Sequence, residues 1–445
     1  MKTVFKITAG LWSEVLGHLR QPHDTAHERV GFISCQISKS SPKTLVILAQ
    51  KYHPVLDNHY ANDSLVGARI NKEAIRFALQ VALPNNCSMF HVHVHPHHGA
   101  TRFSHTDNDS NHRLIPDFFN VAREKPHGAI VFSFNKARGL VWTSKESYPL
   151  PIDEFVVVGT PLSMWWPENP PNRGDSARDF SRQGFLGPES DKILSRVKIG
   201  IVGLGGGGAH VIQQLAHIGI ARYVICDPDK VENSNLNRLV GATINDVKAK
   251  RYKTFIAGRV VKDLIKNPEI DTHKKWQTGL LNLAECHAIF GCVDSLGDRQ
   301  QLEKFCRGNL IPYIDIGMNV SKSRKSFLVS GQAALSTPGM ACLKCMSILK
   351  DTDLANEEAR YGAAGIRPQV VWSNGVLASS AVGILMSLIC PWGRNHFSNA
   401  VFRVYNGNEH TLEPSTRCRY IPKECRHHLL KDIGWPLFKL SNVKT

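Results

Sequence analysis

The chain has 445 residues, of which 42% are hydrophobic and 21% are charged. This length is too great for one typical core, and this composition excludes a wholly disordered protein. The formal charge of +16 favours acidic partners. However, the basic residues are scattered along the sequence and no nucleic-acid motif is present, so we expect two folded domains and no nucleic-acid partner.

Three features bear on the compartment. The first residues, MKTVFKITAGLW, lack the continuous apolar run of a secretion signal, so we expect a cytoplasmic protein. Eleven cysteines in such a compartment argue against a disulfide framework. The longest apolar run, residues 375–392, is short for a bilayer span and contains serines, which predicts a buried core helix and no membrane partner.

The residues before about 155 have the pattern of a small α+β domain. Alternating apolar residues predict strands, and one segment has helical spacing. The expected strands are residues 30–37, 44–49, 89–94 and 129–134, and the expected helix is residues 71–83. A stretch rich in Pro, Gly and Asn, residues 159–188, resists regular structure, and we place the domain boundary there.

Histidines alternate at the end of the predicted strand 89–94. Alternate residues of a strand point to one face, so His93 and His95 can bind one metal ion. Asp107 follows after a short loop and completes three protein ligands, which leaves a position for water. The pattern therefore predicts a catalytic zinc site.

This run, H-x-H-P followed by a loop and S-x-x-D, resembles the JAMM (MPN) zinc metalloproteases. The proline after His95 selects His93 and His95 over His91. The loop to Asp107 is one residue longer than the usual pattern, and Asp109 is the weaker substitute.

The same resemblance implies the rest of the catalytic set. Glu28, in an E-x-x-G context, would be the general base, and Ser104 would stabilise the developing oxyanion. Zinc would lower the pKa of the bound water.

A glycine-rich loop opens the second domain. Gly203, Gly205 and Gly208 form G-x-G-x-x-G between a predicted strand, residues 197–202, and a helix from 209 to about 217. Such a loop approaches a phosphate closely and presents a helix N-terminus to it. A second predicted strand ends at Asp227, whose carboxylate can bind ribose hydroxyls. These features fit NAD as well as ATP.

The next segment favours ATP. The run D-x-D…S-N-L-N-R, residues 227–238, resembles the adenylating domain of ubiquitin-activating enzymes and of the bacterial ThiF and MoeB proteins. The resemblance spans roughly residues 179–392. It implies that Asp227 binds ribose and that Asn235 and Arg238 hold phosphates. A lysine should also reach the phosphates; Lys250 and Lys253 compete for this role, and Lys253 is favoured because it begins a predicted helix.

Two further roles come from this resemblance. Asp294, at the end of the predicted strand 288–293, would coordinate magnesium, although a helix cap is the alternative. Arg182 resembles the arginine that reaches the nucleotide of the partner subunit, which implies a homodimer through the adenylation domain; simple solvation is the alternative. A carboxylate of a carrier protein would then attack the α-phosphate, and pyrophosphate would leave.

The cysteines leave the next step open. The crossover region, residues 350–368, contains no cysteine, so a thioester step does not come with the resemblance, and direct transfer to a conjugating enzyme or a hydroxyl group stays open. A C-x-x-C pair is one half of a zinc site; a catalytic thiol and inert burial are the alternatives. The expected structural zinc ligands are Cys342, Cys345, Cys418 and Cys425.

Together these features predict an α/β protein with a JAMM/MPN domain at 1–155, a linker with the start of the adenylation domain at 156–190, and a Rossmann-like, mainly parallel adenylation domain at 191–445. The expected cofactors are ATP, Mg and Zn. The joint hypothesis is a bifunctional enzyme of a bacterial-type conjugation system that adenylates a ubiquitin-like protein and trims or deconjugates it. Its rivals are sulfur-carrier activation for cofactor or siderophore biosynthesis, a non-catalytic scaffold, and an NAD oxidoreductase.

Overall fold

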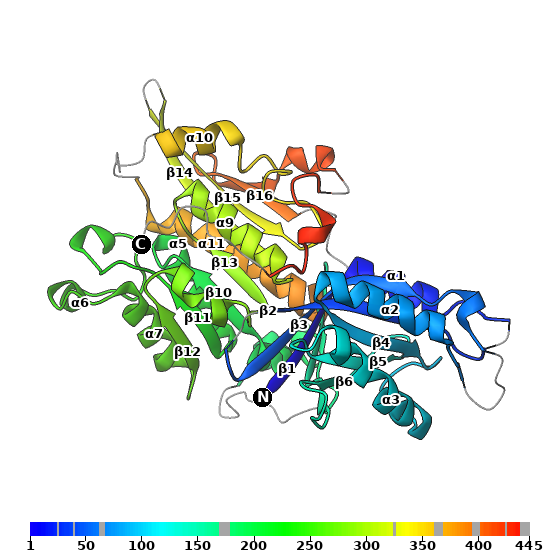
Figure 1. The fold of residues 1–445 in the computed structure, drawn as a ribbon. Helices are drawn as coiled ribbons and strands as arrows, with labels where there is room; N and C mark the ends of the chain where they lie inside the picture. Colours follow the sequence, from blue (N-terminus) through cyan, green and yellow to red (C-terminus); the bar gives the residue numbers. More distant parts are fainter. Residues whose placement is uncertain are drawn as a thin grey trace. The chain divides into compact units, whose positions relative to one another are not determined.

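The structure is a computed structural model (Figure 1). It describes residues 1–24, 26–38, 41–61, 67–168, 179–323, 326–359, 368–393, 401–422 and 425–436. Contacts divide the chain into two units. Unit 1 comprises mainly Met1–Gly159 and Ser163–Pro170, and unit 2 contains most of the remainder, chiefly Pro171–Asp432.

Unit 1 is built on a nine-stranded sheet in the order β7-β6-β5-β4-β2-β3-β1-β8-β9. Its strands are β1 Lys2–Thr8, β2 Val30–Ser38, β3 Thr44–Pro54, β4 Ser88–Val94, β5 His127–Phe132, β6 Ala137–Trp142, β7 Leu150–Pro151, β8 Glu154–Val158 and β9 Ser163–Trp165. Its helices are α1 Ala9–Leu19, the 3-10 helix η1 Asp57–His59, α2 Lys72–Asn85 and α3 His105–Val121. The predicted strands and the predicted helix are all present, with β3 longer than expected.

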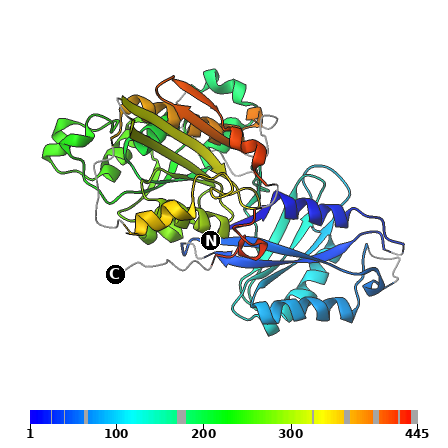
Figure 2. The ribbon, with the colours of Figure 1, turned by 90° about the horizontal axis from the view of Figure 1, so that it is seen from above.

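Helices cover both faces of this sheet, as Figure 2 shows for the dark blue α1 on one side and the lighter blue α2 on the other. The side chains of α1 share a core with Phe90, Val92 and Val94 of β4. The side chains of α2 and α3 share a second core with Met89. Because alternate residues of β4 face opposite sides, His91 and His93 lie on the face that α2 and α3 cover.

Unit 2 contains an eight-stranded sheet in the order β12-β11-β10-β13-β14-β15-β16-β17. Its strands are β10 Lys198–Val202, β11 Arg222–Cys226, β12 Glu269–His273, β13 Ala288–Gly291, β14 Tyr313–Ser323, β15 Ser326–Ser336, β16 Val401–Asn406 and β17 Thr411–Pro414. From β12 to β14 neighbouring strands are parallel, and from β14 to β17 they are antiparallel. The expectation of a mainly parallel sheet was therefore wrong for this half, because β14 pairs along its whole length with the strand that directly follows it.

The helices of unit 2 lie around this sheet, and Figure 1 shows α9 in front of it with α5 and α11 behind. The α-helices are α4 Ser190–Arg196, α5 Gly206–Ile218, α6 Ile244–Lys248, α7 Lys253–Leu264, α8 Leu280–Leu283, α9 Leu296–Gly308, α10 Asp351–Ala359 and α11 Val371–Ile389. The 3-10 helices are η2 Ser181–Leu186, η3 Asn233–Asn235, η4 Trp276–Gly279, η5 Pro391–Gly393, η6 Thr416–Tyr420 and η7 Leu430–Asp432.

The apolar run near residue 380 forms α11. By length and composition alone this helix is long and apolar enough to cross a bilayer, but most of it is buried inside unit 2. It packs against α5, β14 and β15. This matches the predicted buried core helix.

The parallel strands of unit 2 bring distant residues to one edge. Val202 at the end of β10 is in register with Cys226 at the end of β11 and with Gly291 at the end of β13. Because the carboxyl ends of parallel strands meet at the same edge, the segments that follow these three residues converge there. This edge holds the predicted nucleotide site.

Candidate functional site

The glycine-rich loop of unit 2 has the geometry that its sequence predicts. Gly203 has a φ of +90°, which side-chain-bearing residues rarely adopt. A Cβ atom on Gly208 would collide with the carbonyl oxygen of Gly203. Gly205 is the N-cap of α5, and a Cβ there would meet nothing within 4 Å. The loop therefore presents the α5 N-terminus to an open space.

Asp227 fixes this loop to the next strand. One carboxylate oxygen accepts the N–H of Leu204 at 2.7 Å, and the other accepts the N–H of Asp229 at 2.8 Å. The side chain is buried, and this burial raises the pKa of Asp227 although nearby Lys253 lowers it. The carboxylate thus lies directly beside the glycine loop, where the sequence places a ribose ligand.

Of the two competing lysines, Lys253 lies in the site. Its Nζ atom is 2.6 Å from a carboxylate oxygen of Asp229 and 3.9 Å from one of Asp227. Lys250 is exposed and does not line the cavity. A nucleotide phosphate would compete with Asp229 for the Lys253 ammonium group.

Gly205 and Lys253 lie at the wall of a cavity of about 300 Å³. It is lined by Gly205, Asp229, Lys230, Glu232, Asn235, Arg238, Lys253, Asp294 and Gln369. Five of these were predicted from the sequence. Asp229, Lys230, Glu232 and Gln369 were not; the first three lie within the recognised D-x-D run, whereas Gln369 reaches the site only through the fold.

Two of the predicted phosphate ligands are held by local hydrogen bonds. The side-chain oxygen of Asn235 accepts the N–H of Glu232 at 3.0 Å. Arg238 donates to the carbonyl oxygen of Ser234 at 2.7 Å and to the side chain of Asn237. Both side chains are therefore oriented at the cavity wall before any nucleotide arrives.

Asp294 follows β13 and lines the cavity, where Gln369 donates to its carboxylate at 3.4 Å. The preceding carbonyl group, of Val293, accepts the Nε–H of the buried Arg299 at 3.1 Å. Arg299 in turn lies 3.6 Å from Asp315. Carboxylate oxygens of this kind suit Mg²⁺. Arg182, on η2, is exposed and is not a lining residue.

Unit 1 brings together the residues predicted for the zinc hydrolase. Ligand atoms of Glu28, His93 and His95 all lie within 4.8 Å of one another. Asp107 lies 3.4 Å from Nε2 of His93 and 3.6 Å from Nε2 of His95. The buried Nε2 atom of His93 has no hydrogen-bond partner among the described residues, which is the state expected of an imidazole aimed at a metal.

The cap of α3 positions Asp107. Ser104 is the N-cap: its Oγ accepts the N–H of Asp107 at 3.1 Å, while Asp107 accepts the N–H of Ser104 at 2.7 Å. Burial raises the pKa of Asp107, but His93 and the hydrogen bonds with Ser104 lower it by more. The pKa of Asp107 is therefore below that of an ordinary aspartate. The alternative ligand, Asp109, instead pairs with His105 on the exposed side of α3.

Glu28 approaches the cluster from the loop before β2. Its Oε1 atom lies 4.0 Å from Nε2 of His95, and burial raises the pKa of its carboxyl group. Gly67 forms the wall behind it. The carbonyl oxygen of Gly67 accepts the N–H of Glu28 at 3.0 Å, and a Cβ on Gly67 would lie 2.8 Å from the Glu28 carboxyl group. The sequence did not indicate this role for Gly67.

The neighbouring buried polar groups support the two histidines. Nδ1 of His95 lies 3.4 Å from the hydroxyl of the buried Thr101. His91 does not belong to the metal cluster; it faces the buried Asn111 at 3.4 Å. Two imidazoles and a carboxylate suit zinc and leave a position for water.

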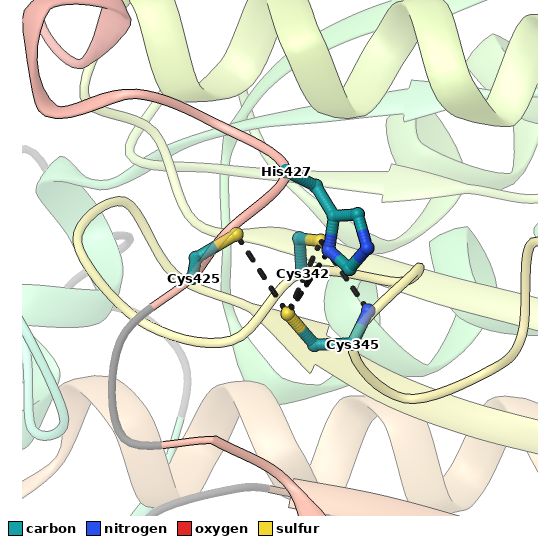
Figure 3. Close-up of side chains that lie close together, drawn as sticks. All are labelled: Cys342, Cys345, Cys425 and His427. Carbon is teal, nitrogen blue, oxygen red and sulfur yellow. Dashed lines mark hydrogen bonds between the residues drawn. The ribbon is translucent and has the colours of Figure 1, made fainter.

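A second metal-binding arrangement lies in unit 2 (Figure 3). It consists of Cys342, Cys345, Cys425 and His427. The thiol of Cys345 lies 3.6 Å from that of Cys342 and 3.7 Å from that of Cys425. Nδ1 of His427 lies 3.5 Å from Cys342 and 3.3 Å from Cys345.

The inclusion of Cys418 in this set was wrong. Cys418 lies in η6 and packs against the apolar core, with its thiol directed to the carbonyl oxygen of Phe402 at 3.9 Å. His427 takes its place, and the sequence analysis missed it because only cysteines were considered. Three thiols and one imidazole are a ligand set typical of structural zinc.

Two buried charged side chains on α9 bind the backbone next to this cluster. The carboxylate of Glu303 on α9 accepts the N–H of Leu343 at 2.8 Å, and Arg307, one turn later, donates to the carbonyl oxygens of Thr337 and Met340. A hydrogen bond from the side chain of Cys342 lowers the pKa of Cys425 below that of an ordinary thiol. A thiolate is the form that binds metal.

The model of the ThiF family matches residues 178–426, which is more than half of the chain. The chain belongs to the ThiF family. Unit 2 is therefore an α/β, Rossmann-like adenylation domain of the kind found in ubiquitin-activating enzymes.

Curated relatives agree with this assignment. The chain is 29% identical over 210 residues to the SAMP-activating enzyme E1 of Haloferax volcanii, covering 45% of this chain and 72% of that protein. It is 28% identical over 230 residues to the sulfur carrier protein ThiS adenylyltransferase of Escherichia coli, covering 48% of this chain and 85% of that protein. It is 24% identical over 284 residues to ubiquitin-like modifier-activating enzyme 5 of Xenopus laevis, covering 58% and 67%.

Proposed function

We propose that unit 2 uses ATP and magnesium to adenylate the C-terminal carboxylate of a ubiquitin-like or sulfur-carrier protein. The observation that carries this proposal is the convergence of the glycine loop, Asn235, Arg238, Lys253 and Asp294 on one cavity of about 300 Å³. The names of the relatives, which include a SAMP-activating enzyme and a sulfur-carrier adenylyltransferase, support the same class of substrate.

The residues of the cavity divide the work of this reaction. The N–H groups at the α5 N-terminus and the Arg238 guanidinium group bind phosphate oxygens. Lys253 leaves Asp229 and offsets charge that develops on the phosphates. Asp294 would hold a magnesium ion, which would offset the negative charge of the phosphates. The carrier carboxylate attacks the α-phosphate and pyrophosphate leaves, so no side-chain nucleophile is needed.

The fate of the adenylate separates two versions of this function. No cysteine lies between Cys345 and Cys390, so the crossover segment of this chain offers no thiol for a thioester. This favours direct transfer of the activated carboxylate, either to a conjugating enzyme or to a sulfur donor. Activation of a sulfur carrier is therefore kept as the alternative to ubiquitin-like conjugation.

For unit 1 we infer a JAMM-type zinc hydrolase that cleaves the peptide or isopeptide bond after the carrier's C-terminus. His93, His95 and Asp107 would hold zinc, which lowers the pKa of bound water. Glu28 would accept the proton of that water. Ser104 keeps its hydroxyl proton, because its oxygen is the acceptor in the α3 cap, and can donate it to the developing oxyanion.

Both activities on one chain serve one carrier: unit 1 exposes or recovers its tail, and unit 2 activates it. The proposal includes a bacterial-type system, a cytoplasmic location and a homodimer in which Arg182 reaches the nucleotide of the partner subunit. Its exposed position on η2 leaves that guanidinium group accessible.

The adenylation step is tested by incubating the full chain with ATP, Mg²⁺ and purified ubiquitin-like proteins that end in Gly-Gly. Intact mass should show an adenylated carrier, and labelled pyrophosphate should exchange into ATP. A carrier–protein adduct supports conjugation, and thiocarboxylate formation with a sulfide donor supports the alternative. Protection by NAD without any exchange of pyrophosphate would overturn adenylation.

The hydrolase is tested separately with the same carriers extended by a short peptide beyond Gly-Gly. Cleavage after Gly-Gly should require zinc and survive removal of ATP. A zinc-loaded protein that cleaves none of the extended carriers would contradict the assignment of unit 1.

A further inference from the structure

The edge of the unit 2 sheet at β12 carries a concentration of positive charge. Residues 248–275 contain nine lysines and arginines against three acidic residues, a difference of +6 within a chain whose total is +16. This segment runs from α6 through α7 to the end of β12, which is the edge strand of the sheet. Figure 1 shows α6, α7 and β12 next to one another.

Six exposed residues form the surface that we call the basic strip. They are Lys230, Arg251, Lys262, Lys266, Lys274 and Lys275. None of the six has an ion pair with a described residue. Two of the three acidic residues of the segment, Glu269 and Asp271, are paired with Arg222 and Lys198, which lie outside the strip. They therefore do not neutralise it.

Two aromatic rings order the cations of the strip. Tyr252 has Lys230 at 5.2 Å and Lys274 at 4.9 Å from its ring centre. Phe255 has Arg251 at 4.6 Å from its ring centre and the neighbouring Arg259 at 6.0 Å. Cation–π contacts hold the charged groups in place without neutralising them.

Helix geometry extends the strip along α7. Phe255, Arg259 and Lys262 follow one another at intervals of four and three residues, which places them on one side of α7, and Lys266 follows just after this helix ends at Leu264. A β-bridge between Lys230 and Tyr252 joins this side to the rim of the nucleotide cavity. Lys230, Tyr252 and Lys274 thus lie together, and the cations of this segment are less scattered than the sequence indicated.

We propose that the basic strip binds the phosphate backbone of a nucleic acid. Cations without ion pairs bind phosphates and displace the counterions of the nucleic acid, which drives such binding. A protein partner fits less well, because the centre of a protein interface is depleted of charged residues. Phe255 is the one large apolar side chain in residues 248–275 that is exposed. The absence of a recognition motif agrees with binding to the backbone and not to bases.

Lys230 of the strip lines the nucleotide cavity, but the three lysines chosen for the test below do not. Lys262, Lys266 and Lys274 do not line the nucleotide cavity. A nucleic acid on the strip would be bound by the same unit that forms the adenylated carrier. Because the tested lysines lie outside the nucleotide cavity, we expect RNA binding without the carrier protein and without ATP turnover.

The test uses a fluorescein-labelled, 20-nucleotide single-stranded RNA and fluorescence anisotropy between 50 and 200 mM KCl, with the full chain. The variant is Lys262→Gln/Lys266→Gln/Lys274→Gln. Each lost phosphate contact should lower the slope of log K against log salt by about 0.7, so the total fall should be about 2 and the affinity should drop at least about tenfold.

The matched control neutralises three other exposed lysines of unit 2, in Lys304→Gln/Lys350→Gln/Lys431→Gln. It should keep both the affinity and the salt slope, and both triple variants should keep the wild-type rate of ATP–pyrophosphate exchange. Equal losses in the two variants, or no RNA binding at 50 mM KCl, would overturn the proposal. So would poly-glutamate that binds as tightly as the RNA, because the strip would then be a site for acidic polypeptides.

Discussion

The two metal-binding arrangements of this protein differ in the chemistry of their ligands. In unit 1, two imidazoles and a carboxylate meet beside a second carboxylate, Glu28. In unit 2, three thiols and one imidazole, that of His427, lie together. Three ligands leave zinc a place for water, whereas four ligands close it. Zinc would therefore have a catalytic role in unit 1 and a structural role in unit 2.

The largest effect should come from breaking the closed site. In Cys345→Ser the zinc content should fall by one ion per chain, and unit 2 should lose a large part of the roughly 10 kcal/mol that a structural zinc ion contributes to folding. Zinc analysis and thermal unfolding measure this. Cys418→Ser is the control and should keep its zinc and most of its thermal stability, because Cys418 lies outside the cluster and only packs against the apolar core. If the two variants had the same zinc content and the same thermal stability, the assignment of a structural zinc site would be contradicted.

Breaking the open site should abolish one activity and spare the fold. Glu28→Gln should keep its zinc and lose about a thousandfold in hydrolysis, because a general base contributes 10² to 10⁴. Zinc loss in Glu28→Gln would instead make Glu28 a ligand. Adenylation should be unchanged. In the parent protein, hydrolysis should fall as the pH drops through the pKa of Glu28, which burial raises above that of an ordinary glutamate.

A variant in the nucleotide cavity tests whether adenylation by unit 2 is independent of hydrolysis by unit 1. Asp294→Asn should reduce ATP–pyrophosphate exchange by about 10²–10³, which is the usual loss when one group that stabilises developing charge is removed. Hydrolysis of an extended carrier by the same variant should be unchanged. If exchange persisted at the parental rate, magnesium would have to be held elsewhere in the cavity.

The smallest expected effect concerns Gly67, which lies directly against the carboxyl group of Glu28. Gly67→Ala adds a methyl group 2.8 Å from the Glu28 carboxyl group, so that carboxyl group must move. Hydrolysis should fall by about ten- to a hundredfold with zinc content retained, since small misplacements of a catalytic group are costly. Gly17→Ala, where a Cβ would meet nothing within 4 Å, is the matched control. Full activity of Gly67→Ala would show that Glu28 tolerates displacement.

Residues that are close in sequence were the easiest to place. His93 and His95 share a face because a strand repeats every two residues, and Asn235 and Arg238 follow directly from a recognisable run. The parallel strands that carry Asp227 and Asp294 could also be predicted, since their apolar segments alternate with helices. Local pattern therefore accounts for most of both candidate sites.

Residues that come together only through the fold could not be placed. His427 takes the place of Cys418 in the thiol cluster, and only the fold shows which of the residues near Cys425 meets Cys342 and Cys345. Gln369 meets Asp294 only because α11 begins beside β13's end. In the antiparallel half of the sheet, β14 and β15 form a local hairpin, whereas the pairing of β15 with β16 joins segments far apart in the sequence.

The cap of α3 has a consequence for how this protein is studied. Asp107 is at once a proposed zinc ligand and the third residue of a reciprocal helix cap with Ser104. Replacing Asp107 removes both, and a lost cap alone destabilises a helix by about 1 kcal/mol. An inactive reference protein made at Asp107 would confuse catalysis with folding. His95→Ala, whose side chain caps no helix, gives the cleaner inactive enzyme for trapping an uncleaved carrier.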